Sequence, residues 1–151
     1  MAGWTNRGKF LITGTYFQGD TAPTNFYVAL ATDATAPTAD TNTLSELTEI
    51  AAGNGYTSGG ISLSRNATDF DTQTETDASD IAFVQIRDLV WTASGGSLPG
   101  SGSGARYAVL TTDEVTVGNR QVVAWWDLTS ARTVSSGQTL TLQNCELRLT
   151  E

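Results

Sequence analysis

The chain has 151 residues, of which 16 are acidic and 8 basic, so its formal net charge is −8. This length suits one domain that buries roughly 70% of the surface its unfolded chain would expose. The acidic balance, without a basic cluster, argues against partners such as nucleic acid or an anionic membrane. The sequence holds no His and one Cys, so the Ser-His and Cys-His pairs of nucleophilic catalysis cannot form. We therefore expect a protein that is not an enzyme and uses no cofactor.

The N-terminus and the single thiol indicate where the chain is made. The first residues lack the apolar core of a signal peptide, and no apolar run approaches about 18 residues. Cys145 has no partner for an intramolecular disulfide, and the leucines around it predict a buried thiol. We expect synthesis in a cytoplasm.

The first predicted element is a short helix over residues 5–17, with Thr5 or Asn6 as its N-cap. Gly8 and Gly14 weaken this helical pattern, because glycine lowers helix propensity. The apolar positions of the segment are Phe10, Leu11 and Tyr16.

A strand is expected over residues 25–31, where apolar side chains alternate between two faces. Residues 32–42 are rich in Ala, Thr, Pro and Asp, which indicates a surface loop. Thr43 and Glu46 have the spacing of a capping box, so we expect one or two helical turns through Ile50.

The remainder of the chain alternates strand-like runs with short turns. Gly118-Asn119 and Gly137 fall where hairpin turns would need a positive φ. The sequence therefore predicts an all-β fold over residues 1–151, a single-domain β-sandwich or jelly-roll-like barrel with one or two short helices in its N-terminal third. The runs expected to be strands are 60–64, 80–87, 89–92, 106–111, 121–128, 138–143 and 146–150.

Six blocks of sequence carry a resemblance to a known family. They are FYVAL at 26–30, Glu49-Ile50, GNGY at 53–56, DLVWTASGG at 88–96, ARYAVL at 105–110 and WD at 126–127. Together they resemble a family of small virion structural proteins of tailed bacteriophages, through most of the chain. The insert at 97–104 departs from the shorter members.

The resemblance implies a setting in the phage particle, on the head or on the tail. We expect a capsid decoration (cement) protein that stabilises the head by binding across capsomers, after synthesis in the bacterial host cytoplasm. The partners would then be the major capsid protein or other virion proteins, and further copies in a homo-oligomer, with a trimer as one option. The alternatives are a tail or fibre component of the virion and a glycan-binding module for host recognition.

Acidic residues recur between Asp69 and Asp80, mostly two positions apart, as the ligands of a Ca²⁺ loop do. The EF-hand pattern needs Gly at its sixth place and Glu at its twelfth, where this segment has Thr74 and Asp80. A solvated loop or a strand edge is therefore the favoured interpretation, and a cation site stays open. Acids alternating with Thr would also protect an exposed edge from aggregation.

Four aromatic residues could form a stacking platform for sugar rings. Trp125 and Trp126 are adjacent, so in a strand they point to opposite faces. We therefore favour a place in the core and in a subunit interface, with glycan binding as the alternative. The set is Trp91, Tyr107, Trp125 and Trp126.

The Gly- and Ser-rich stretch 94–104 is not a phosphate loop, because Ala105-Arg106 follow where the Walker pattern needs Lys and then Ser or Thr. We expect a flexible or Ω-like loop, one option being that it becomes ordered only across a neighbouring subunit. Asp113 and Glu114 could act as an acid-base pair in a cleft, but their spacing is equally typical of a turn.

The candidate assembly contacts lie mainly at the N-terminus. An exposed Trp near a terminus is hard to explain in a monomer, so the segment around Trp4 is the expected contact with the shell. The sequence offers no catalytic, cofactor-binding or metal site. The candidate contacts are Trp4, Arg7, Phe10 and Trp125.

Overall fold

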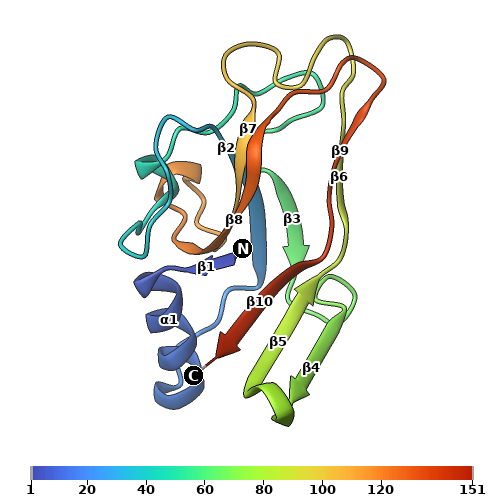
Figure 1. The fold of residues 1–151 in the computed structure, drawn as a ribbon. Coiled ribbons are helices and arrows are strands. Elements are labelled where there is room, and N and C mark those ends of the chain that lie inside the picture. Colours follow the sequence, from blue (N-terminus) through green and yellow to red (C-terminus); the bar gives the residue numbers. More distant parts are fainter. Residues whose placement is uncertain (1, 151) are drawn as a thin grey trace.

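The computed structural model describes residues 2–150, which form antiparallel sheets with one 13-residue helical segment at the N-terminus (Figure 1). Strands take 43% of the chain and helices 15%. The main elements are β1 (Ala2–Trp4), α1 (Asn6–Thr13) with a π-helical turn (Gly14–Gln18), β2 (Asn25–Ala31), β3 (Ile61–Ser64), β4 (Thr72–Thr76), β5 (Ile81–Ile86), β6 (Leu89–Thr92), β7 (Ala105–Thr111), β8 (Val122–Arg132), β9 (Thr139–Leu142) and β10 (Cys145–Thr150). Single 3-10 turns lie at Leu44–Glu46, Asp77–Ser79 and Val117–Asn119.

The first layer is a five-stranded sheet in the order β1-β8-β7-β2-β3. Each pair of neighbours is antiparallel. At its centre Ala108 pairs with Leu30 on one side and with Trp126 on the other. All three side chains belong to the main core.

The second layer is a long bent ribbon. Strand β5 continues into β6 through residues 87–88, and β9 continues into β10 through residues 143–144, so one pair of chain segments forms both halves. Ile86 pairs with Cys145 before the bend, and Leu89 pairs with Leu142 after it. Strand β4 adds the outer edge beside β5, in the order β10-β5-β4.

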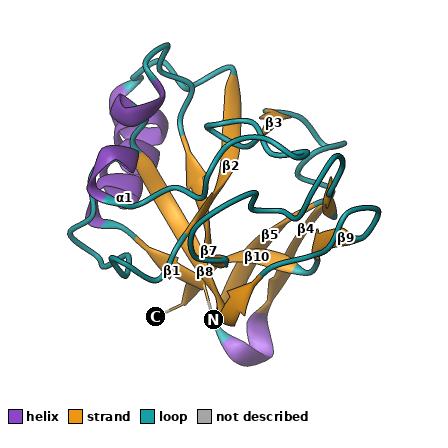
Figure 2. Cartoon of the chain, turned by 90° about the horizontal axis from the view of Figure 1, so that it is seen from above, coloured by secondary structure: helices purple, strands orange, loops and turns teal. Residues whose placement is uncertain are grey.

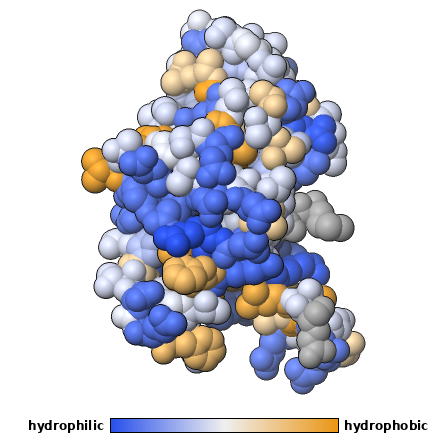
Figure 3. Space-filling model, turned by 90° about the vertical axis from the view of Figure 1, so that its left-hand side faces the viewer, coloured by the Kyte–Doolittle hydropathy of each residue, from blue (hydrophilic) through white to orange (hydrophobic). Residues whose placement is uncertain are grey.

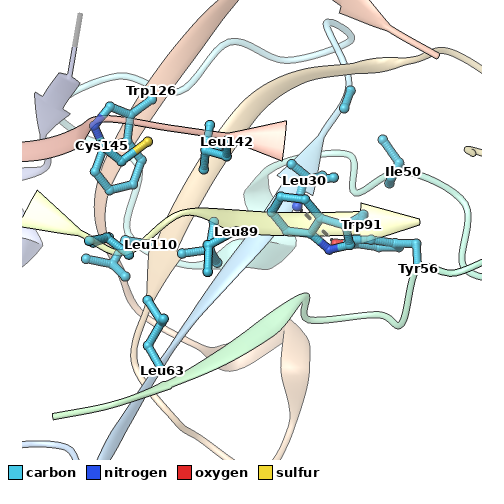
Figure 4. Close-up of a cluster of buried hydrophobic side chains, with 14 of the residues drawn as sticks. Leu30, Ile50, Tyr56, Leu63, Leu89, Trp91, Leu110, Trp126, Leu142 and Cys145 are labelled. Carbon is cyan, nitrogen blue, oxygen red and sulfur yellow. Dashed lines mark hydrogen bonds between the residues drawn. The ribbon is translucent and has the colours of Figure 1, made fainter. Parts of the chain in front are cut away.

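The main core lies between the two layers (Figure 4). Trp91 and Leu89 of β6 face Leu30, Leu63 and Leu110 of the first sheet, and all five are buried. Apolar side chains from both layers are removed from water here, which is the main stabilising term of the fold. The described sheets form a sandwich and close into no barrel, so the β-sandwich prediction is confirmed and the barrel alternative is wrong.

A second, smaller core covers the outer face of the first sheet. Leu44 and Leu47, from the segment that follows β2, pack on this face. The same segment bonds to the end of β2, where Ile50 N–H donates to the Leu30 carbonyl oxygen over 2.9 Å. The residues on the sheet side are Ala29, Ala31, Val109 and Val122.

Most expected strands are confirmed within one or two residues, and β8 is longer than expected, ending at Arg132. Thr5 is the N-cap of the expected N-terminal helix and accepts a bond from Gly8 N–H over 2.7 Å. Sequence reasoning missed β1, which has only three residues, and β4, whose side chains are all exposed. Neither strand carries a periodic apolar signal of its own.

Three local expectations were wrong. The capping box of Thr43 and Glu46 is present, but it starts one 3-10 turn instead of a helix through Ile50, because the chain leaves to pair with the end of β2. Gly137 has the expected positive φ of 85°, whereas Gly118-Asn119 lie in a 3-10 turn without one. The 97–104 insert is anchored: Leu98 is fully buried and exchanges two backbone bonds with Val134.

Candidate functional site

The residues that carry the family resemblance serve the fold. The carboxylate of Glu49 accepts a bond from the Tyr56 hydroxyl over 2.5 Å and from Ser58 over 2.7 Å. The Tyr56 hydroxyl also accepts a bond from Leu30 N–H. Burial first, and the nearby Glu49 charge second, raise the pKa of Tyr56 far above its ordinary value. Glu49 and Tyr56, both in the motif blocks, thus hold the loop between them against β2.

The motif blocks in the second half of the chain also serve the fold. Arg106 and Asp127 form a bidentate ion pair across β7 and β8, with N–O distances of 2.7 and 2.9 Å. Hydrogen bonding to Arg106 holds the pKa of Asp127 below its ordinary range. Leu89, Trp91 and Ala93 of the DLVWTASGG block are buried. These motif residues therefore take part in the packing and strand pairing of the sandwich.

Two glycines of the motif region are required by close backbone contacts. Gly55 has a φ of 99°, and a side chain there would collide with the carbonyl oxygen of Thr92. Gly60 has a φ of 77°, and a side chain there would collide with the carbonyl oxygen of Val28. Both positions need the left-handed backbone that glycine adopts at little cost.

The N-terminal helix packs in an unusual orientation. Its buried positions are Gly8 and Gly14, and Leu11 is partly buried against the main core. The other large apolar side chains, Phe10, Ile12, Tyr16 and Phe17, are exposed. Any side chain at Gly8 would collide with the carbonyl oxygen of Val123 on β8. Gly8, which weakens the helical pattern, is therefore the residue that lets the helix lie close against the sheet, whereas a side chain at Gly14 would meet the Asp20 carboxylate.

The outward side of this helix is the most apolar exposed surface that we find on the described residues. Tyr16 and Phe17 are 82% and 79% exposed, and Phe10 and Ile12 are 56% and 40% exposed. The rings of Tyr16 and Phe17 meet edge to face with centroids 5.0 Å apart. Figure 3 shows orange side chains among blue ones on the face that carries this helix. We call Phe10, Ile12, Tyr16 and Phe17 the aromatic helical surface.

Neighbouring polar groups hold part of this surface in place. The Arg7 guanidinium lies 5.1 Å from the centroid of the Phe10 ring and also donates to the side chain of Gln121. Gln121 in turn donates to Glu114 over 2.8 Å. Arg7 and Phe10, two of the candidate contacts, are thus brought together by the fold, and Phe10 is exposed as expected.

The other two candidate contacts have partners within the chain. Trp4 is only partly exposed, and its Nε1 donates to the carbonyl oxygen of Arg148 over 2.7 Å. The expectation of an exposed Trp4 holds only in part, because the C-terminal strand bonds to its ring nitrogen and covers part of the ring. The half-buried ring of Trp125 lies against Gly3 of β1 and packs on the smaller core.

The four aromatic residues considered for sugar binding do not form one platform. Trp91 and Trp126 are buried in the main core, while Tyr107 and Trp125 pack against the smaller core on the opposite face of the first sheet. The expected opposite directions of Trp125 and Trp126 are confirmed. Sequence reasoning missed the exposed aromatics Tyr16 and Phe17; the two glycines among the apolar residues of 8–17 were visible in the sequence, but which side of the helix they bury was not.

The two acids considered as an acid-base pair, Asp113 and Glu114, form hydrogen bonds within the fold. The Asp113 carboxylate accepts a bond from Asn25 N–H at the start of β2, and Glu114 belongs to the Gln121 network. Within residues 2–150, no group of three or more His, Cys, Asp or Glu residues could hold a metal ion. Cys145 is buried as expected, and burial raises the pKa of its thiol to about 12.

Comparison with known proteins adds no family. No family model, curated protein or solved structure matches this chain. Among the helices of residues 2–150, none combines the length and apolar character required to cross a membrane.

Proposed function

We propose that the chain is a structural subunit of a tailed-phage virion, and within the virion a capsid decoration (cement) protein that binds across capsomers. The resemblance of its sequence blocks supports the virion setting. The observation that supports an assembly role is the N-terminal helix, which turns glycines to the sheet and Phe10, Tyr16 and Phe17 to solvent. Contiguous apolar side chains left in water mark interaction sites in soluble proteins.

The proposed mechanism is multivalent adhesion to the shell. Many copies contact the head at points related by its symmetry, with the major capsid protein or other virion proteins as partners. Once one contact of an oligomer is made, the next is effectively intramolecular, so weak contacts add to strong retention. The shell then resists internal pressure without a single tight interface.

The copy number per particle tests this proposal. Quantitative mass spectrometry of purified virions, with the major capsid protein as internal standard, is expected to give one copy per capsid subunit or a simple fraction such as one third. A handful of copies per particle would contradict decoration and favour the second candidate, a tail or fibre component that uses the same surface.

A further inference from the structure

A groove opens at the end of the molecule that carries the helix. Figure 1 places α1 and the β4–β5 end of the second layer at the same lower end, and Figure 2 shows them on opposite sides. The groove between them has a volume of about 450 Å³. Trp4 and Ile12 line one wall, and Ala82, Val84 and Leu149 line the other. Its floor and walls are therefore largely apolar.

One rim of this groove is formed by the acidic β4–β5 segment: Glu75 lines the groove itself, and Asp77 and Asp80 line an adjoining hollow that shares Glu75. All side chains from residue 71 to residue 80 are exposed, and no Lys or Arg occurs between residues 66 and 86. The ion pairs found among residues 2–150 use Asp69, Asp127 and Glu146, and none of the acids that follow Asp69 on this rim. The acids left without an ionic partner are Asp71, Glu75, Asp77 and Asp80.

The helical segment that carries the aromatic helical surface has the opposite charge. Residues 6–18 contain Arg7 and Lys9 and no acid, so this segment carries two positive charges in a chain of net charge −8. Lys9 takes part in none of the ion pairs of the described residues. The exposed Tyr16–Phe17 ring pair belongs to the same helical segment as these charges, so one molecule carries both a cationic segment with exposed aromatic rings and an apolar groove with acidic residues at its rim.

We propose that the occupant of the groove is a second copy of this chain: the Tyr16–Phe17 pair of one copy enters the groove of the next, and Lys9 faces the acidic rim at Glu75 and Asp77. This inference rests on the proposed function, because an assembly role gives the exposed surface a use. The two contacting surfaces differ, so the contact is heterologous and successive copies build a ring or a chain.

Charge favours this arrangement over a two-fold contact between two helices. A two-fold contact would bring Arg7 and Lys9 of both copies together, and like charges in an interface oppose association. It would also leave the groove and its acidic rim without a partner. The heterologous contact satisfies both surfaces at once.

A single contact of this kind is weak. Each aromatic side chain buries roughly 150–250 Å², whereas stable interfaces bury about 1,200–2,000 Å² in total. We expect association that depends on concentration in solution and becomes effective when copies are held side by side on a shell.

Two variants that each remove one surface test the inference. Tyr16→Ser/Phe17→Ser removes the projection, and Glu75→Lys/Asp77→Lys reverses charge on the rim at exposed positions. Sedimentation velocity of the full chain over a range of concentrations is expected to show association of the wild type. Each variant alone is expected to raise the dissociation constant by about thirtyfold, as loss of a central aromatic contact does.

Mixing the two variants gives the sharpest result. An equimolar mixture pairs the intact groove of one variant with the intact helix of the other, so it is expected to form dimers and nothing larger. Val115→Ser and Asp33→Lys, at exposed positions outside both surfaces, are the controls and should associate like the wild type. A wild type that stays monomeric at millimolar concentration would overturn the inference, as would a mixture that stays monomeric while the wild type associates. Either result would leave the copy number on the virion as a separate test of the proposed function.

Discussion

The β-sandwich of this chain buries large side chains, whereas the N-terminal helix exposes most of its own. In the sandwich, Trp91 is buried between the layers, and every buried side-chain polar atom of the described residues has a hydrogen-bond partner. In the helix, Gly8 and Gly14 face inward while Tyr16 and Phe17 lie in water. The sandwich residues are explained by the fold of one copy. The fold of one copy does not explain the exposed aromatic side chains of the helix, so we assign them to assembly.

The largest expected effect is on the sandwich. Trp91→Ala removes a fully packed ring from the main core and is expected to lower the free energy of unfolding by about 3–5 kcal/mol. Val90→Ala, at the neighbouring and half-exposed position of β6, is the matched control and should cost less than about 1 kcal/mol. Urea denaturation measures both. A cost for Trp91→Ala no larger than the control would contradict the assigned core.

The second prediction concerns the face of the helix that meets the sheet. Gly→Ala normally stabilises a helix by about 1 kcal/mol, but at Gly8 the added methyl group meets the Val123 carbonyl oxygen. We expect Gly8→Ala to destabilise the protein by about 1–3 kcal/mol. Gly118→Ala, where the new methyl group has room, should be within about 0.5 kcal/mol of the wild type. Thermal unfolding of the pair distinguishes them, and a stabilising Gly8→Ala would show that the helix does not lie on β8.

The third prediction uses the buried hydroxyl of the motif region. The pKa of Tyr56 is raised in the folded state, so its stabilising contribution is complete below the ordinary value of 10.0 and is lost as pH rises above it. Tyr56→Phe is expected to cost about 1–2 kcal/mol at neutral pH, because Leu30 N–H and Glu49 lose a partner. The variant should also lose less stability than the wild type between roughly pH 9 and 11.

Cys145 needs its own control in that experiment. Burial raises the pKa of its thiol from 9.0 to about 12, so it weakens the fold in the same alkaline range. Cys145→Ala should therefore flatten part of the alkaline loss independently of Tyr56→Phe. Identical alkaline profiles for Tyr56→Phe and wild type would argue against a buried, bonded Tyr56.

The smallest effect on stability is expected at the aromatic helical surface. Tyr16→Ser/Phe17→Ser removes two rings that are mostly in water, so the free energy of unfolding should change by less than about 0.5 kcal/mol. Chemical denaturation beside Phe26→Ser, a ring that packs against the main core, provides the contrast. A strong loss of stability in the double variant would mean that these rings support the fold.

Much of the sandwich could be predicted from local sequence. Leu89–Thr92 was expected from its alternation, and β6 has these bounds, with Leu89 and Trp91 buried and Val90 and Thr92 exposed. Strand β4 could not be found in this way, because its exposed Thr, Gln and Glu residues form a strand only by pairing with β5. The acidic stretch was nevertheless expected to be a loop or a strand edge, and β4 is an edge strand.

The candidate contacts were harder to predict, because they depend on pairings between distant parts of the chain. Trp4 is covered by β10 at the other end of the sequence, and the direction of the helix is set by Gly8 against β8. Apolar residues in the helical segment predicted a helix, but only the packing of the glycines decides which side faces water. Sequence reasoning therefore named Phe10, which is exposed, as a candidate contact and did not name Tyr16 or Phe17.

The central claim is that the aromatic helical surface serves assembly and not folding. On the virion role proposed above, the most direct measurement is the copy number of Tyr16→Ser/Phe17→Ser in purified particles, against the major capsid protein, beside the wild type and the Val115→Ser control. We predict that the folded double variant is largely lost from the particle while the control keeps the wild-type ratio. Incorporation of the double variant at the wild-type ratio would contradict the claim.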